Sequence, residues 1–136
     1  MINQLLNNST IGVLEQVVNF TQARHGVLAG NIANLDTPGY QSRDLSVERF
    51  EQSLKQALEA ESKPQSLGGQ TVPATTKSLA EIGASMDSLL YHDGSDVSLE
   101  QQITEISKNH GKHNLAISLM TAQFRQLESA ISERVI

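Results

Sequence analysis

Two heptad patterns, one toward each end of the chain, constrain its fold more than any other feature of the sequence. The first is an N-terminal seam whose members alternate in steps of four and three residues: Leu14, Val18, Thr21, His25, Leu28, Ile32 and Leu35. The second is a C-terminal seam with the same alternation: Leu99, Ile103, Ile106, His110, His113, Ile117, Met120, Phe124, Leu127 and Ile131. A repeat of about 3.5 residues is the spacing at which α-helices pair in coiled coils. The seams therefore predict two long helices, one within residues 1–35 and one within residues 97–136.

Each predicted helix carries a second apolar stripe beside its seam. The N-terminal stripe is Val13, Val17, Phe20 and Val27, with Arg24 in its course. The C-terminal stripe is Leu115, Leu119 and Ala122. An antiparallel hairpin of the two helices would leave these second stripes exposed, and contiguous exposed apolar surface marks an interaction site. We therefore expect the chain to complete its core with neighbouring subunits.

The segment between the helices, residues 36–96, predicts a third helix and irregular structure. A short amphipathic helix is expected over about residues 47–60, with Ser46 as its cap. Its apolar face would consist of Phe50, Leu54 and Leu58. Residues 62–78 are rich in Ser, Thr, Pro, Gly and Gln, a composition that does not order itself. Residues 86–91 leave both a strand and a short helix open, so the predicted class is mainly α with an irregular or partly extended middle.

The two long helices carry distinct start and stop signals. The last helix is expected to begin at Ser98, because Gln101 completes the spacing of a capping box. The first helix is expected to end near Asn34, which suits a left-handed C-terminal cap. Pro38 and Gly39 fit the second and third positions of a type II turn, since proline presets φ and glycine accepts φ above zero. Several independent devices thus fix the direction in which the chain leaves the first helix.

A group of small residues lies beside the N-terminal seam, just before this turn. The group is Gly26, Ala29, Gly30 and Ala33. Because such side chains occupy little space, they allow the backbone of another segment to approach the helix closely. We expect this small-residue surface to take part in packing against a neighbour.

Charge and composition exclude several classes of protein. Fifteen acidic and ten basic residues give a net charge of −5 without a basic cluster, so the electrostatic footprint of nucleic-acid or anionic-membrane binding is missing. The chain has no cysteine, which excludes disulfides, thiol catalysis and cysteine-ligated zinc. No run reaches the roughly 18 apolar residues of a membrane span, and the N-terminal residues lack the features of a secretory signal. Any export is therefore expected to use another route.

No constellation of residues predicts catalysis or a bound cofactor. The motifs of serine hydrolases, zinc metalloproteases and phosphate-binding loops are absent from the sequence. Three seam histidines, His25, His110 and His113, form only a partial metal-ligand set, and we interpret them as polar residues that specify register. If an antiparallel pairing sets His25 against His110, their protonation below about pH 6.5 would loosen the helix pair.

The stretch from Ala29 to Tyr40, AGNIANLDTPGY, closely resembles the N-terminal signature of bacterial flagellar rod and hook proteins. The signature residues, which we call the assembly motif, are Ala29, Asn31, Ile32, Ala33, Asn34, Asp36, Thr37, Pro38, Gly39 and Tyr40. The following stretch, residues 42–58, is similar to the proximal rod members of that family. The resemblance covers nearly the whole chain and is strongest over residues 14–58 and 97–131.

The resemblance implies a structural subunit without enzymatic activity, cofactor or nucleic-acid partner. Residues 1–35 and 97–136 would form one coiled-coil inner domain. The implied partners along the axis are other copies of the chain and the rod proteins FlgC, FlgF and FlgG-like, which together make the drive shaft and export channel. At the rod base they are the adaptor FliE, the inner-membrane ring and the export gate. The implied location is the basal-body rod spanning the periplasm, reached through the flagellar type III apparatus without a cleaved signal.

Two other interpretations remain open from the sequence. A self-contained coiled-coil adaptor would hold its hairpin folded in isolation and offer the second stripe to one partner. A different axial protein of the rod or hook would carry a larger middle domain than this chain contains.

Overall fold

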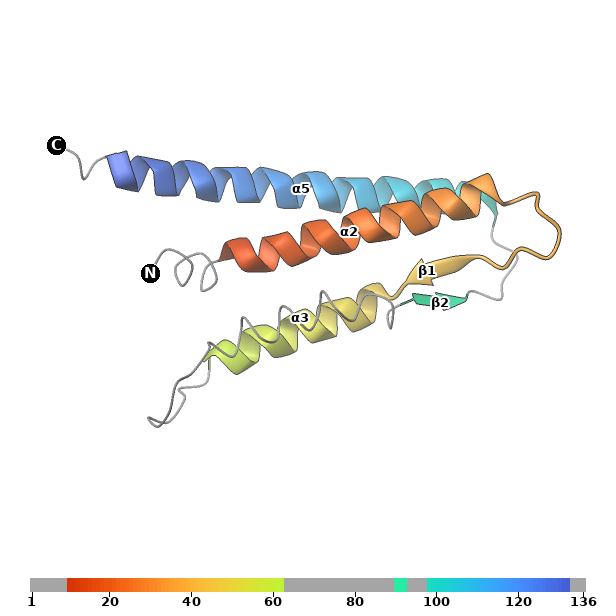
Figure 1. Cartoon of the computed structure of the whole chain (residues 1–136), viewed down its shortest axis with the longest axis horizontal. Helices are drawn as coiled ribbons and strands as arrows, with labels where there is room; N and C mark the ends of the chain where they lie inside the picture. Colours follow the sequence, from red (N-terminus) through yellow and green to blue (C-terminus); the bar gives the residue numbers. More distant parts are fainter. Residues whose placement is uncertain (1–9, 63–89, 93–97, 133–136) are drawn as a thin grey trace.

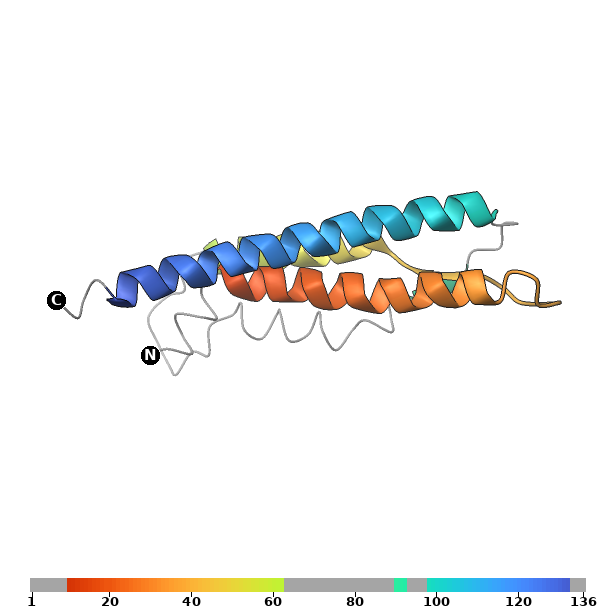
Figure 2. The ribbon, with the colours of Figure 1, turned by 90° about the horizontal axis from the view of Figure 1, so that it is seen from above.

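Two long helices that run side by side in opposite directions dominate the structure. The computed structural model describes residues 10–62, 90–92 and 98–132. In chain order the elements are α2 (Thr10–Ala33), β1 (Arg43–Leu45), α3 (Val47–Ser62), β2 (Leu90–His92) and α5 (Leu99–Ser132). Helices α2 and α5 form the antiparallel hairpin, and α3 runs alongside α2 (Figure 1, Figure 2). The predicted mainly α class, with long terminal helices and a short third helix, is confirmed.

Side chains from both long helices fix the register of the hairpin. The Nδ2 atom of Asn109 donates to the backbone oxygen of Thr21 at 2.7 Å. Closer to the turn, Asn31 Nδ2 donates to Gln102 Oε1 at 3.2 Å. The end of α2 therefore lies against the beginning of α5. No helix in the described part of the chain combines the length and apolar character needed to cross a membrane.

The helix starts predicted from serine caps are confirmed. The backbone N–H of Arg49 donates to Ser46 Oγ at 3.3 Å at the start of α3. In the same way the N–H of Gln101 donates to Ser98 Oγ at 3.2 Å at the start of α5. Each hydroxyl satisfies one of the backbone donors that a helix N-terminus leaves without a partner.

Helix α2 ends at Ala33, as predicted, but the left-handed cap expected at Asn34 is wrong. None of the described residues other than glycine has a positive φ. Instead, Asn34 Nδ2 donates to the backbone oxygen of Gly30, four residues earlier in the helix, at 2.9 Å. An asparagine side chain that bonds a final helical carbonyl in this way caps the helix without leaving the right-handed region.

The predicted turn after α2 is confirmed. Gly39 has φ of 76°, and the N–H of Tyr40 donates to the oxygen of Thr37 at 3.1 Å. Pro38 and Gly39 thus occupy the two central positions of a turn that requires positive φ at the second. The loop carrying this turn projects beyond the ends of α2 and α5 (Figure 1, Figure 2).

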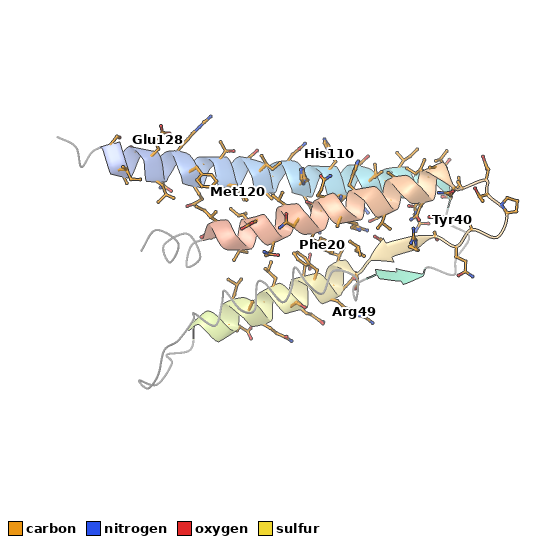
Figure 3. All side chains as sticks on the ribbon, in the orientation of Figure 1. Phe20, Tyr40, Arg49, His110, Met120 and Glu128 are labelled. Carbon is orange, nitrogen blue, oxygen red and sulfur yellow. The ribbon has the colours of Figure 1, made fainter. Side chains whose placement is uncertain are left out.

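Aromatic stacking holds α3 against α2. The rings of Phe20 and Phe50 lie 4.1 Å apart between centroids and 9° from parallel. Phe20 points into the space between the two helices (Figure 3). Leu45 and Ala57 complete this buried cluster, and the predicted apolar face of α3 is buried at Phe50, half-buried at Leu54 and exposed at Leu58.

A two-stranded antiparallel sheet joins the middle of the chain to the hairpin. Strand β1 pairs with β2 in the register Arg43 with His92, Asp44 with Tyr91 and Leu45 with Leu90. Strand β2 overlaps residues 86–91, where the sequence left strand and helix open. Strand β1 was not predicted, because three residues are too few for an alternating pattern. Residues 63–78, expected to be irregular, lie outside the described residues.

Candidate assembly surfaces

The side of α5 that faces α2 is largely polar. The covered residues of α5, buried or half-buried, are Gln102, Glu105, Ile106, Asn109, His113, Ala116, Met120 and Gln123. Gln102, Asn109 and Ala116 are the most deeply buried of them. Helix α5 therefore contributes little apolar surface to this contact, whereas α2 contributes the buried Leu14 and Leu28.

The C-terminal seam lies beside this contact and not at its centre. Three of its ten residues, Ile106, His113 and Met120, are half-buried against α2. The other seven are exposed: Leu99, Ile103, His110, Ile117, Phe124, Leu127 and Ile131. Exposed fractions of 48% for Ile103, 42% for Ile117 and 48% for Phe124 show how much apolar surface this helix presents to water.

The N-terminal seam is divided between the hairpin contact and the same open side. Leu14, Thr21 and Leu28 are buried, whereas Val18 and Ile32 are half-buried and His25 and Leu35 are exposed. At about 100° per residue, Val18, His25 and Ile32 share one flank of α2, and Ile103, His110 and Ile117 share one flank of α5. We call these two flanks the outer face of the hairpin.

A buried arginine ties three elements together. Arg24 is 5% exposed and donates to both carboxylate oxygens of Asp44 in β1, through Nε at 2.8 Å and Nη2 at 2.7 Å. Its Nη2 also donates to Glu105 Oε2 of α5 at 2.9 Å. The Asp44 hydrogen bonds raise the pKa of Arg24 further above its usual range, so the guanidinium stays charged. In the sequence, Arg24 stands out as a charged residue within an apolar stripe. Its partners Asp44 and Glu105 could not be predicted from that pattern.

Glu105 is expected to make stability depend on acid pH. Hydrogen bonds from Lys108, at 3.0 Å, and then from Arg24 hold the pKa of Glu105 below its usual value. The stabilisation is therefore present above the unfolded pKa of about 4.3 and is lost as pH falls through the lower folded pKa. Because the side chain is 29% exposed, Glu105→Gln should lower the free energy of unfolding by only about 1 kcal/mol at pH 7.

Urea unfolding at several pH values would measure this effect. The difference between Glu105→Gln and the natural chain should shrink as pH falls below about 4. Glu15→Gln, which removes an exposed carboxylate from α2, is the control and should change the free energy of unfolding at pH 7 by less than about 0.5 kcal/mol. An equal loss at pH 7 in both variants would contradict the assignment.

Asn31 connects the helical hairpin to the loop that follows α2. Its Nδ2 donates to the backbone oxygen of Arg43 at 2.6 Å and to Gln102, while its Oδ1 accepts from Tyr40 Oη at 3.0 Å and from the Arg43 N–H at 3.1 Å. The side chain is 2% exposed. Tyr40 lies between the end of α2 and β1 (Figure 3). The side chain of Asn31 thus fixes where the loop comes back to the hairpin, at Tyr40 and Arg43.

The assembly motif therefore divides into an anchored part and an exposed part. Asn31 and Tyr40 bond each other at the base of the loop. Asp36, Thr37, Pro38 and Gly39 are exposed at its tip. Ala29 and Ala33 are exposed on α2, and Ile32 and Asn34 are half-buried. Side chains added at Gly26 or Gly30 would meet nothing within 4 Å, so the small-residue surface is open among the described residues.

The seam histidines lie in two environments, with His113 bonded to Thr21 and the other two exposed. Thr21 Oγ1 lies 2.8 Å from His113 Nδ1 and within donating distance of the Val17 oxygen at 2.9 Å. Since the hydroxyl has one proton, it accepts from His113 when it donates to the backbone. His25 and His110 are both exposed. Across the described ranges, no three side chains of the metal-ligating types form a cation site.

A polar cleft of about 330 Å³ lies beside the Arg24 network, between β1, α3 and α5. Arg24, Asp44 and Glu105 line it and bind one another. Lys108 binds Glu105 as well, so two cations balance the two carboxylates. Such a network suits the positioning of elements better than acid–base chemistry. The geometry thus describes an interaction scaffold with two distinct surfaces, the projecting loop and the outer face.

Comparison with known proteins agrees with this description. A family model described as flagella basal body rod protein matches residues 19–41, which include Arg24, Asn31 and the turn. The chain is therefore similar to flagellar basal body rod proteins.

The most similar proteins found include FlgB proteins, and the similarity extends over most of each chain. FlgB of Escherichia coli is 26% identical over 125 residues, which cover 86% of this chain and 88% of the relative. FlgB of Bacillus subtilis is 25% identical over 130 residues, covering 93% and 96%. FlgB of Aquifex aeolicus is 28% identical over 125 residues, covering 91% and 94%.

Proposed function

We propose that the chain polymerises through its outer face as a structural subunit of the flagellar basal body rod. Similarity to flagellar basal body rod proteins supports the role in the basal body. The role of the outer face is supported by α5, which buries polar side chains in the hairpin and exposes apolar ones. Amides are buried against α2, while Ile103, Ile117 and Phe124 are exposed. Fully burying one such side chain contributes about 1.5–3 kcal/mol, so a neighbour that covers these half-exposed residues gains on the order of 3 kcal/mol.

We base the location, the export route and the neighbours of the subunit on its similarity to flagellar rod proteins. The subunit lies in the proximal rod of the periplasm-spanning shaft, has no catalytic function, and reaches its place through the type III apparatus. Its neighbours are other copies, the rod proteins FlgC, FlgF and FlgG-like, and, at the base, FliE, the inner-membrane ring and the export gate. Both seams and the exposed tip of the assembly motif supply the contacts. The small-residue surface, from Gly26 to Ala33, admits a neighbouring helix at short distance.

Charge introduced on the outer face should abolish rod assembly. In cells that lack their own copy of the gene, Ile103→Asp with Ile117→Asp is expected to eliminate motility, because two carboxylates cannot be buried in an apolar contact. Unfolding of the purified variant should change by less than about 1 kcal/mol, since both sites are exposed in the hairpin. Motility in soft agar and the recovery of the chain in purified basal bodies measure assembly.

The matched control carries the same charge elsewhere on α5. Thr104→Asp with Ser118→Asp places two carboxylates on exposed positions about 100° around the helix from Ile103 and Ile117, and motility should be retained. Normal motility of the Ile103 and Ile117 variant, with normal amounts of the chain in basal bodies, would refute the role of this face.

The turn at Pro38 and Gly39 should matter for assembly more than for solubility. Pro38→Ala with Gly39→Val removes the preset φ and places a β-branched residue at φ of 76°, where even an ordinary side chain costs roughly 1–2 kcal/mol. Because the tip is exposed, the purified variant should stay soluble while motility falls. Gly111→Val, an exposed helical glycine without positive φ, is the control. Full motility in the double variant would contradict the role given to the turn.

A further inference from the structure

Buried residues of the hairpin recur every seven positions on both helices and meet in three layers. On α2 this series is Leu14, Thr21 and Leu28, and on α5 it is Gln102, Asn109 and Ala116. All six residues are 9% exposed or less. Asn109 Nδ2 donates to the Thr21 oxygen at 2.7 Å, so Thr21 and Asn109 form the central layer. Because the helices are antiparallel, the flanking layers are Leu28 with Gln102 and Leu14 with Ala116.

The amide of Asn109 has a partner at only one end. Its side chain is 1% exposed, and its buried Oδ1 has no hydrogen-bond donor among the described residues. An acceptor that is buried without a donor keeps the cost of leaving water. The bond made by Nδ2 offsets little of this cost, because the Thr21 oxygen already belongs to the helical hydrogen-bond ladder of α2. Asn109 therefore makes the hairpin less stable than an apolar residue of the same branching would.

The spacing of seven allows two other alignments of the helices. Sliding α5 by one heptad, about 10.5 Å, would bring Asn109 opposite Leu28 or opposite Leu14. A leucine side chain covers the backbone behind it, so neither end of the amide would find a partner there. Thr21 is the smallest member of its series, and its short side chain leaves its carbonyl within reach of Asn109.

We propose that Asn109 is a register lock, a residue that excludes the two heptad-shifted pairings of α2 and α5 at a cost in stability. A buried asparagine in a coiled-coil seam acts in this way, because only one alignment gives its amide a partner. The contact between Arg24 and Glu105 opposes the same shifts, so a test of the lock has to separate the two. Since the lock acts within one chain, it does not depend on how copies of the chain assemble.

The cost in stability predicts that an apolar residue at position 109 strengthens the hairpin. Asn109→Leu keeps the branching and needs no hydrogen bond. Its urea midpoint should exceed that of Asn114→Leu, at an exposed asparagine of the same helix, by about 0.5 M. The comparison removes the difference in helix propensity between the two residue types. Asn109→Val, compared with Asn114→Val, covers the case in which leucine overpacks the layer. If neither Asn109 variant exceeds its control, the cost is refuted.

Distances between spin labels measure the register itself. Because the chain has no cysteine, nitroxide labels can be attached at Ala29→Cys and Thr121→Cys, which are both exposed positions. The layers place these sites about 30 Å apart along the helices, and a shift by one heptad changes this distance by about 10 Å. Glu105→Gln, which weakens the contact with Arg24, should leave one distance in double electron–electron resonance. Adding Asn109→Leu should produce a second population about 10 Å away.

The control and the contrary outcomes use the same labelled sites. Asn114→Leu, added to Glu105→Gln in place of Asn109→Leu, should leave the single distance unchanged. One distance in the combined Glu105 and Asn109 variant would overturn the lock, because the register would then be set without Asn109. Two distances in Glu105→Gln alone would overturn it as well, because Asn109 would then fail to hold the pairing.

Discussion

Replacing Arg24 by methionine is expected to lower the free energy of unfolding by about 4 kcal/mol. The guanidinium is 5% exposed and holds Asp44 and Glu105 through three hydrogen bonds of 2.7–2.9 Å. Methionine keeps much of the volume but leaves two carboxylates close together, one of them 16% exposed, without their cation. Urea unfolding followed by circular dichroism at neutral pH measures the loss.

Two further variants test whether this loss comes from the ion network. Arg125→Met removes an exposed arginine from α5 and should change stability by less than about 0.5 kcal/mol. Adding Asp44→Asn to Arg24→Met should restore part of the loss, because the two residues act as one coupled pair. Equal effects of the Arg24 and Arg125 variants would show that the network contributes nothing.

Replacing Asn31 by alanine is expected to cost about 3 kcal/mol. The substitution removes the partner of the Tyr40 hydroxyl, of the Arg43 N–H and carbonyl, and of Gln102. Groups left buried without hydrogen bonds lose the interaction and retain the cost of leaving water. Hydrogen exchange at the Arg43 N–H should also speed up, because that amide is no longer held by Asn31.

Asn19→Ala is the matched control for Asn31. Asn19 is an exposed asparagine on the same helix, and alanine there should be neutral or slightly stabilising, since alanine has the higher helix propensity. If both alanine variants unfold at the same urea concentration, Asn31 does not anchor the loop. If Asn31→Ala loses stability without faster exchange at Arg43, the loop is held by other contacts.

The sequence by itself determined the helices and their ends. Periodicity close to the helical repeat is a local property, so the two long helices could be predicted from the spacing of their seams. Ser46 and Ser98 act on backbone groups within three residues, and the Pro38–Gly39 turn depends on the φ preferences of those residues. Helix caps and turns of this kind can be predicted from sequence because the residues that cause them lie within a few positions of the backbone they affect.

Only the tertiary structure decided which side of each helix faces its partner. The coiled-coil rule favoured Ile103 and Ile117 as contact residues, but Gln102 and Asn109 lie against α2. The physical reason is that the amides find hydrogen-bond partners across the hairpin in Asn31 and Thr21. These bonds, together with the contact between Arg24 and Glu105, rotate α5 by about half of the 100° that separates successive residues. Ile106, His113 and Met120 therefore stay half-buried against α2.

The same rotation decides where the apolar surface goes. A heptad pattern states that apolar residues share one side of a helix, but it does not state whether that side meets the same chain or a neighbouring one. Here the paired side is held by polar contacts between residues 71 to 92 positions apart, a separation over which single-sequence patterns carry no information. The sequence thus determined the helices and their apolar stripes. The tertiary structure decided that much of this apolar surface remains exposed, because hydrogen bonding across the hairpin fixed the orientation of α5.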